Sequence, residues 1–184
     1  MTSRVAMPGL RTPGAGFDQP FEMLAACHER VVRTLDLLQR LQAYVADQGV
    51  DDNARQAARD VLRYFDQAAP LHHEDEELHV FPPLLRPASD AATQAVVRQL
   101  QQDHVDMAAC WALARQPLQA LAEGLQAVFS AADSALLQRF AALYGQHLRH
   151  EDQLIYPAAR AVLDVSSQQA MGREMAVRRG AEKS

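Results

Sequence analysis

The chain contains one chemical pattern twice, at residues 72–82 and 147–157. Each copy begins with a histidine that is followed four residues later by a glutamate, and ends with an aliphatic residue, an aromatic residue and a proline. A histidine and a glutamate at this spacing lie on one stripe of an α-helix, about 6 Å apart along its axis. Two such helices that face each other can direct two imidazoles and two carboxylates at one point, as helical bundles do in two-metal sites.

Apolar residues recur every three or four positions over four long stretches, which predicts four amphipathic helices. We expect these helices at about residues 18–48, 54–85, 90–115 and 130–163. Pro70 is expected to kink the second helix just before its histidine, and Ser130 with Asp133 predicts a capping box at the start of the fourth. The predicted fold class is all-α, an antiparallel up-down four-helix bundle with a short extra C-terminal helix.

The two ends of the chain differ from this predicted domain, which covers residues 18–165. Residues 1–17 are rich in glycine and proline and predict a flexible N-terminal arm. Residues 166–184 predict a short helix followed by a frayed basic tail that contains Arg178 and Arg179. The sequence leaves open whether this helix packs on the bundle, docks a second chain to form a homodimer, or stays loose.

The composition excludes several classes of protein. A chain of 184 residues is long enough for one domain with a sizeable core, and a formal net charge of −5 gives no sign of a nucleic-acid surface. No apolar run approaches the ~20 residues of a membrane span, and the N-terminus lacks the pattern of a secretory signal. Two cysteines make no disulfide framework. We therefore expect a cytoplasmic protein with no nucleic-acid or membrane partner.

Each of the four predicted helices carries a histidine on its apolar stripe, and two of the helices add a glutamate. The six residues are His28, His72, Glu76, His104, His147 and Glu151. A single histidine, or a single histidine–glutamate pair, is more often an ordinary core or surface contact. Two carboxylates and four imidazoles in one apolar core would instead cost on the order of several kcal/mol each without partners. A pair of metal ions satisfies all six, so we predict that they are metal ligands.

The neighbouring pair His73 and Glu77 has the same spacing and is the alternative to His72 and Glu76. The repeat favours the earlier pair, because its two members align with the second copy at one common offset of 75 residues. Under this alignment Glu77 corresponds to Asp152.

Three further residues near the repeat have more than one interpretation. His79 either supports the site from a distance or is a satisfied core histidine, and we favour the latter, whereas His150 is expected to be solvated. Tyr144 precedes His147 by about one turn. It either donates a hydrogen bond into the site or is a core tyrosine whose hydroxyl is satisfied elsewhere.

In these features the sequence resembles the hemerythrin family, specifically the hemerythrin HHE cation-binding domains. The resemblance covers about residues 20–163 and depends on the six residues occurring in this order, one set on each helix. The aromatic–proline pair that ends each copy is also typical of bacterial members. The resemblance implies a non-haem di-iron centre inside an up-down bundle, with both glutamate carboxylates bridging the irons.

One departure from the family bears on function. Oxygen-carrying hemerythrins have two histidines four residues apart on the third helix, whereas the neighbours of His104 at that spacing are Leu100 and Ala108. The metals would then have open positions. The resemblance thus implies binding of, or reaction with, a small ligand such as dioxygen, nitric oxide or peroxide, as in the di-iron proteins linked to nitric-oxide stress and iron–sulfur repair.

Two other functions stay open at this point. The first is an iron sensor or store, since metal binding can be strongly coupled to folding. The second is an interaction module that the metal orders. The sequence does not decide whether the protein is an enzyme with catalytic turnover.

Overall fold

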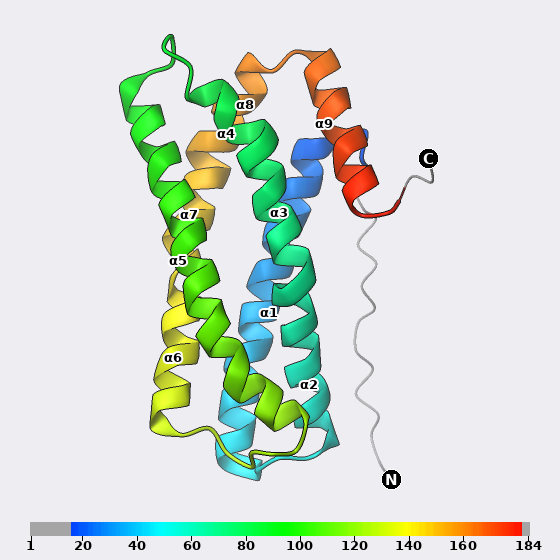
Figure 1. The fold of residues 1–184 in the computed structure, drawn as a ribbon, viewed down its shortest axis with the longest axis vertical. Helices are drawn as coiled ribbons and strands as arrows, with labels where there is room; N and C mark the ends of the chain where they lie inside the picture. Colours follow the sequence, from blue (N-terminus) through cyan, green and yellow to red (C-terminus); the bar gives the residue numbers. More distant parts are fainter. Residues whose placement is uncertain (1–15, 182–184) are drawn as a thin grey trace.

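The structure, a computed structural model, describes residues 16–181, and every regular element in this part of the chain is a helix. Residues 1–15, which hold most of the predicted arm, and residues 182–184 lie outside the described part. Long helical runs lie side by side, and the last helix packs near one end of them (Figure 1). The all-α prediction is confirmed.

The four long runs differ in how continuous they are. Two are single helices, α1 (Pro20–Gln48) and α5 (Ala91–Ala122). The second run consists of α2 (Asp52–Arg63), η1 (Tyr64–Ala68), α3 (Ala69–Asp75), η2 (Glu76–Val80) and α4 (Phe81–Leu84). The fourth run consists of α6 (Ala131–Ala142), α7 (Tyr144–His150), η3 (Glu151–Ile155) and α8 (Tyr156–Val162). The short helix α9 (Val165–Arg178) follows.

Side chains cap several of these helices at their N-termini, where backbone N–H groups lack partners within the helix. Asp90 accepts a hydrogen bond from the N–H of Thr93 at the start of α5. At the start of α6, Ser130 and Asp133 form the predicted capping box, in which each side chain accepts from the backbone N–H of the other residue.

Helix α5 is longer than the sequence predicted, because it runs through Pro117 to Ala122 instead of ending near residue 115. A proline inside a helix removes one N–H donor and crowds the carbonyl four residues earlier. That carbonyl belongs to Leu113, whose side chain is exposed, so the proline lies beside an exposed part of the helix. Leu118 and Leu121 beyond the proline are buried and hold the extra turns against the core.

The three segments η1, η2 and η3 are π-helical turns, and each ends two residues before a proline. Proline disturbs the helix on its N-terminal side, and a wider turn with i→i+5 hydrogen bonds accommodates this disturbance. The disturbance predicted before Pro70 therefore takes the form of η1. The other two turns begin at Glu76 and Glu151, so the helices change their winding at the two glutamates of the repeat.

The apolar core has two parts, which lie on either side of a polar layer in the middle of the helices. One part includes Phe65 and Phe140, and the other includes Phe81 and the two buried methionines of α9. Helix α9 approaches the chain before α1 so closely that a Cβ atom on Gly172 would lie 1.8 Å from the carbonyl oxygen of Phe17. The C-terminal helix thus packs on the bundle, which the sequence had left open.

Within residues 16–181, no helix has the length and apolar character needed to cross a membrane.

Candidate metal centre

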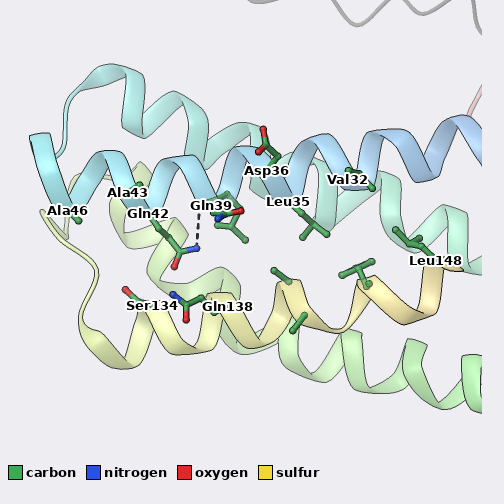
Figure 2. A pocket seen from close by; sticks show the side chains of 15 residues that line it. Val32, Leu35, Asp36, Gln39, Gln42, Ala43, Ala46, Ser134, Gln138 and Leu148 are labelled. Carbon is green, nitrogen blue, oxygen red and sulfur yellow. Dashed lines mark hydrogen bonds between the residues drawn. The ribbon is translucent and has the colours of Figure 1, made fainter.

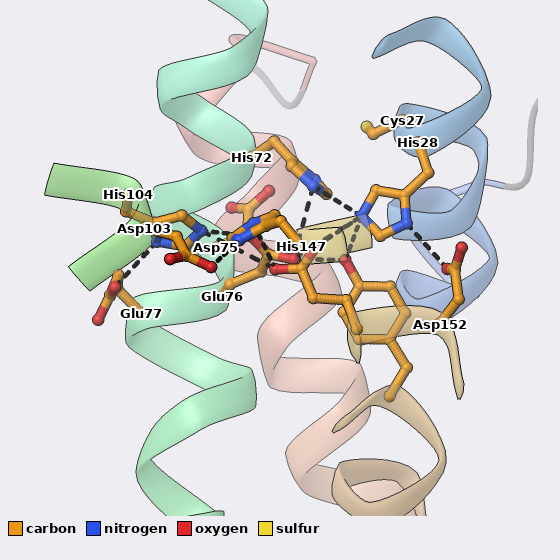
Figure 3. A network of polar contacts seen from close by, with 12 residues as sticks. Cys27, His28, His72, Asp75, Glu76, Glu77, Asp103, His104, His147 and Asp152 are labelled. Atoms are coloured by element: carbon orange, nitrogen blue, oxygen red, sulfur yellow. Dashed lines mark hydrogen bonds and ion pairs between the residues drawn. The ribbon is translucent and has the colours of Figure 1, made fainter. Parts of the chain in front are cut away.

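The polar layer contains all six residues that the sequence predicted to converge. They come from every long run: His28 from α1, His72 from α3, Glu76 from η2, His104 from α5, His147 from α7 and Glu151 from η3. All six are buried, and both glutamates are 0% exposed. Figure 3 shows the histidines of different helices turned toward one region of the interior.

The four histidines form two pairs. Nε2 of His28 lies 3.1 Å from Nε2 of His72, and the rings of His104 and His147 have centroids 4.9 Å apart. Ligand atoms of His28, His72, Glu76 and Glu151 lie within 4.8 Å of one another, as do those of His73, His104 and His147. These two groups define two candidate metal positions.

Glu76 lies between the two histidine pairs and directs one oxygen atom toward each. Its Oε1 is 3.5 Å from Nε2 of His72 and 4.0 Å from Nε2 of His28. Its Oε2 is 3.5 Å from Nε2 of His104.

Glu151 divides its oxygen atoms in the same way. Its Oε2 is 3.2 Å from Nε2 of His28, and its Oε1 is 3.0 Å from Nε2 of His147 and 3.9 Å from Nε2 of His104. Both carboxylates are therefore placed to bridge two ions, one at each histidine pair.

Several atoms at the centre have no hydrogen-bond partner within residues 16–181. They are Nε2 of His104, Nε2 of His147, Oε2 of Glu76 and both carboxylate oxygens of Glu151. A buried polar atom without a partner is costly, and a buried carboxylate is more costly still. Because all of these atoms face the same interior region, cations placed there would satisfy them together, and nitrogen with oxygen donors suits iron, manganese, zinc or copper.

Carboxylates on other helices hold the outward nitrogens of three of the rings. Nδ1 of His28 lies 2.8 Å from Oδ1 of Asp152, and Nδ1 of His104 lies 2.9 Å from Oε1 of Glu77. Nδ1 of His147 lies 3.3 Å from an oxygen of Asp103. Such contacts make Nδ1 the donor and leave Nε2 free to bind a cation.

Glu77 was half of the alternative pair in the sequence, and the structure places it outside the cluster. It contacts the outer side of His104 and accepts a hydrogen bond from Gln101. Its repeat equivalent Asp152 has the same relation to His28. The repeat aligns these two residues but gives no sign of this role, because each acts on a helix other than its own.

His73, the other half of that pair, is partly buried and stacks on His104 with ring centroids 4.0 Å apart. Burial, together with the positive charge of His104, lowers the pKa of His73 to about 3. The ring is therefore neutral at the edge of the cluster, on the side of the His104 and His147 pair.

The charges inside the cluster shift the pKa values of His28 and Glu151 in opposite directions. Burial alone would lower the pKa of His28, but the carboxylates of Asp152 and Glu151 outweigh it and raise that pKa to about 10. Burial alone would raise the pKa of Glu151, but His147 and His28 outweigh it and lower that pKa to about 2. The carboxylates thus favour positive charge at this point, which protons or metal ions can supply.

The tyrosine whose hydroxyl contacts the cluster is Tyr156, not Tyr144, which the sequence had singled out. Tyr144 is buried among aromatic rings, and its ring centroid lies 5.4 Å from that of Phe140 and 5.7 Å from that of Phe65. Tyr156 instead donates a hydrogen bond to Oε1 of Glu76, and its oxygen lies 2.9 Å from Nε2 of His28. Burial and the negative charge of Glu76 raise the pKa of Tyr156 well above its usual value.

Asp75 connects the cluster to the C-terminal helix. It directly precedes Glu76, is 0% exposed, and accepts hydrogen bonds from the guanidinium groups of Arg178 and Arg179. The prediction that these arginines belong to a frayed tail is therefore wrong. The pairing was not visible in the sequence, because it joins residues more than 100 positions apart.

The two remaining histidines lie outside the cluster. His79 is partly buried and pairs with Glu174 of α9, 3.1 Å away. His150 lies in the outer part of α7, near Gln146.

Two cavities flank the cluster on the side of Tyr144. One, of about 270 Å³, is mostly apolar and reaches His73; its walls include Phe65, Met107, Trp111, Phe140 and Tyr144. The other, of about 870 Å³, is a groove between α1 and the fourth run, and none of the six cluster residues lines it (Figure 2). None of the six lines the smaller cavity either, but His73 in its wall stacks on His104, so this cavity borders the cluster through that ring.

Comparisons with known proteins agree with this geometry. The family profile described as Hemerythrin HHE cation binding domain matches residues 19–159. An uncharacterized protein of Haemophilus influenzae is 34% identical over 166 residues, which cover 90% of this chain and 92% of that relative.

Proposed function

Because the chain belongs to the family of hemerythrin HHE cation-binding domains, whose members bind metal cations and often iron, we propose that it is a non-haem di-iron protein. In this proposal the helices form an antiparallel up-down bundle around two irons. A small ligand such as dioxygen, nitric oxide or peroxide binds or reacts at an open position. When bound, the iron pair supplies electrons and free coordination positions for that ligand.

The observation that carries the proposal is the division of each glutamate between two histidine pairs. His28 and His72 would hold one iron, and His104 and His147 the other. Two carboxylates bring two negative charges to the centre, which partly balance the charge of two cations in a buried place.

Other residues of the chain orient the ligands and limit the access of water. Asp152 and Glu77 hold the rings of His28 and His104 from outside, which keeps Nε2 of each ring turned inward. The walls of the smaller cavity are mostly apolar, so it favours a diatomic molecule over water. Arg115 at its edge pairs with Asp66, 3.0 Å away, and therefore brings no free positive charge to the entrance.

One observation favours a second candidate function, a sensor, store or interaction module that the metal orders. Asp75 ties α9 to the turn that carries Glu76, through two arginines. Metal binding at Glu76 would then also stabilise the attachment of α9. A cytoplasmic location and the absence of a nucleic-acid partner remain predictions from the net charge and the sequence.

Metal analysis tests the proposal. Protein loaded with iron should hold about two metals per chain, because six ligands with two bridging carboxylates serve two ions. The ferric protein should absorb in the near ultraviolet, and the spectrum should change on addition of azide or nitric oxide. A content of one iron or fewer after loading would refute the dinuclear site.

Two variants separate the two glutamates of the first repeat. Glu76→Ala should lose the second metal, whereas Glu77→Gln should keep two metals at saturating iron, because Glu77 acts only on the outer side of His104. The opposite result would assign the site to His73 and Glu77. A sensor or store would release its metal to a mild chelator and lose helical circular dichroism at the same time, whereas a di-iron reaction centre would keep its helices.

A further inference from the structure

Tyr156 is a buried tyrosine whose hydroxyl lies inside the candidate ligand cluster. Its oxygen is 2.9 Å from Nε2 of His28 and contacts Oε1 of Glu76. The same nitrogen of His28 lies 3.1 Å from Nε2 of His72 and 3.2 Å from Oε2 of Glu151. Neighbouring ligands of one ion lie about 3 Å apart, because bonds of roughly 2.0–2.2 Å meet near right angles. The phenol oxygen therefore stands where one more ligand would stand.

The π-helical turn η3 brings Tyr156 to this place. Tyr156 follows Glu151 by five residues, and in an α-helix this spacing would turn the two side chains about 140° apart. In η3 the N–H of Tyr156 donates to the carbonyl of Glu151, five residues back. An i→i+5 turn is wound more widely and brings the two residues to the same side of the helix.

The first copy of the repeat contains the matching position without a hydroxyl. Phe81 follows Glu76 by five residues, and its N–H donates to the carbonyl of Glu76 in η2. The ring of Phe81 stacks on His104 with a centroid distance of 5.6 Å and an interplanar angle of 23°. Tyr156 stacks on His28 in the same way, at 5.1 Å and 22°. The two halves thus build equivalent aromatic contacts, and only the second adds an oxygen atom.

We propose that Tyr156 is a further metal ligand, bound as a phenolate to the iron held by His28 and His72. The inference rests on the proposed di-iron function. Binding replaces the phenol O–H bond by a coordinate bond from the phenolate oxygen; the proton passes to solvent, and no electron is transferred.

The consequence is that the two irons differ. The position held by His28 and His72 gains a fifth protein ligand. The position of His73, His104 and His147 has Phe81 at the matching place and gains no oxygen ligand there. The smaller apolar cavity reaches His73 on the side of this second pair. The small ligand therefore binds at the iron of His104 and His147.

Visible spectroscopy of the iron-loaded protein tests the assignment. A phenolate bound to ferric iron gives a visible charge-transfer band, and resonance Raman excitation in that band enhances tyrosine ring modes. The wild-type protein should show both, Tyr156→Phe should lose both, and its affinity for one of the two irons should fall by about tenfold or more. Tyr144→Phe is the matched control, since Tyr144 is also buried but its ring packs against Phe65 and Phe140, and it should keep the band.

The possible failures are distinguishable. A wild-type protein that holds two irons but shows no band, or a Tyr156→Phe variant with an unchanged band, would overturn the ligand assignment and leave the di-iron proposal intact. A wild-type protein that holds one iron or fewer would overturn the di-iron proposal itself. If Tyr156→Phe does not fold, ring-deuterated tyrosine in the wild-type protein decides: shifted Raman modes support a phenolate, and unshifted modes overturn it.

Discussion

The contact between Asp75 and the C-terminal helix gives a prediction whose size follows from the structure. Asp75 is 0% exposed, and the side chains of Arg178 and Arg179 are only 17% and 18% exposed. Removing one partner of a buried ion pair costs roughly 3–5 kcal/mol, because the other charge stays buried without compensation. The arginines can partly regain water at the surface and an asparagine still accepts a hydrogen bond, so we expect Asp75→Asn to destabilise the protein by about 2–3 kcal/mol.

The assay is denaturant unfolding of the metal-free protein, in which a loss of this size lowers the folding equilibrium constant roughly 30- to 150-fold. Limited trypsin digestion adds a local readout, since cleavage at Arg178 or Arg179 requires α9 to detach. A double-mutant cycle of Asp75→Asn with Arg178→Gln should show a coupling energy above about 0.5 kcal/mol.

Glu174→Gln is the control for this prediction. Glu174 lies on the same helix and pairs with Arg178 at 3.6 Å and with His79 at 3.1 Å, but its side chain is 59% exposed, so its removal should change stability by about 0–1 kcal/mol. Equal effects of Asp75→Asn and Glu174→Gln, or no change in the rate of trypsin cleavage, would refute the reasoning.

Two further predictions concern the histidines of the cluster. Glu77→Gln and Asp152→Asn remove equivalent contacts on the outer side of His104 and His28, so each should weaken iron binding about 10- to 100-fold in competition with a chelator; unchanged affinity in both would show that these carboxylates do not orient the rings. In the metal-free protein, the neighbouring carboxylates raise the pKa of His28 from 6.5 to about 10 against the effect of burial. The stabilisation from its charge is therefore fully present below pH 6.5 and is lost as the pH rises through 10; denaturation midpoints that do not fall over this range would contradict the shift.

The sequence was sufficient to predict which side chains would meet. Spacing of three and four residues assigned His28, His72, His104 and His147 to the inner faces of four helices, and burial of all four bears this out. The repeat also favoured Glu76 over Glu77, and the structure buries Glu76 and places Glu77 against the outer side of His104. These features depend only on helix periodicity and on the repeat, and both can be recognised in the amino-acid sequence.

Tertiary structure decided what each of these groups touches. The outer carboxylates Glu77 and Asp152 act on rings of other helices, and Asp75 meets arginines about 100 residues away, so no local pattern could reveal these pairs. The place of Tyr156 depends on a π-helical turn, whose wider winding moves a residue five positions after a glutamate onto the glutamate's own face. A proline two residues after each such turn was visible in the sequence, but Pro117 lies inside α5 without any π-helical turn, so a proline in the sequence does not by itself predict such a turn.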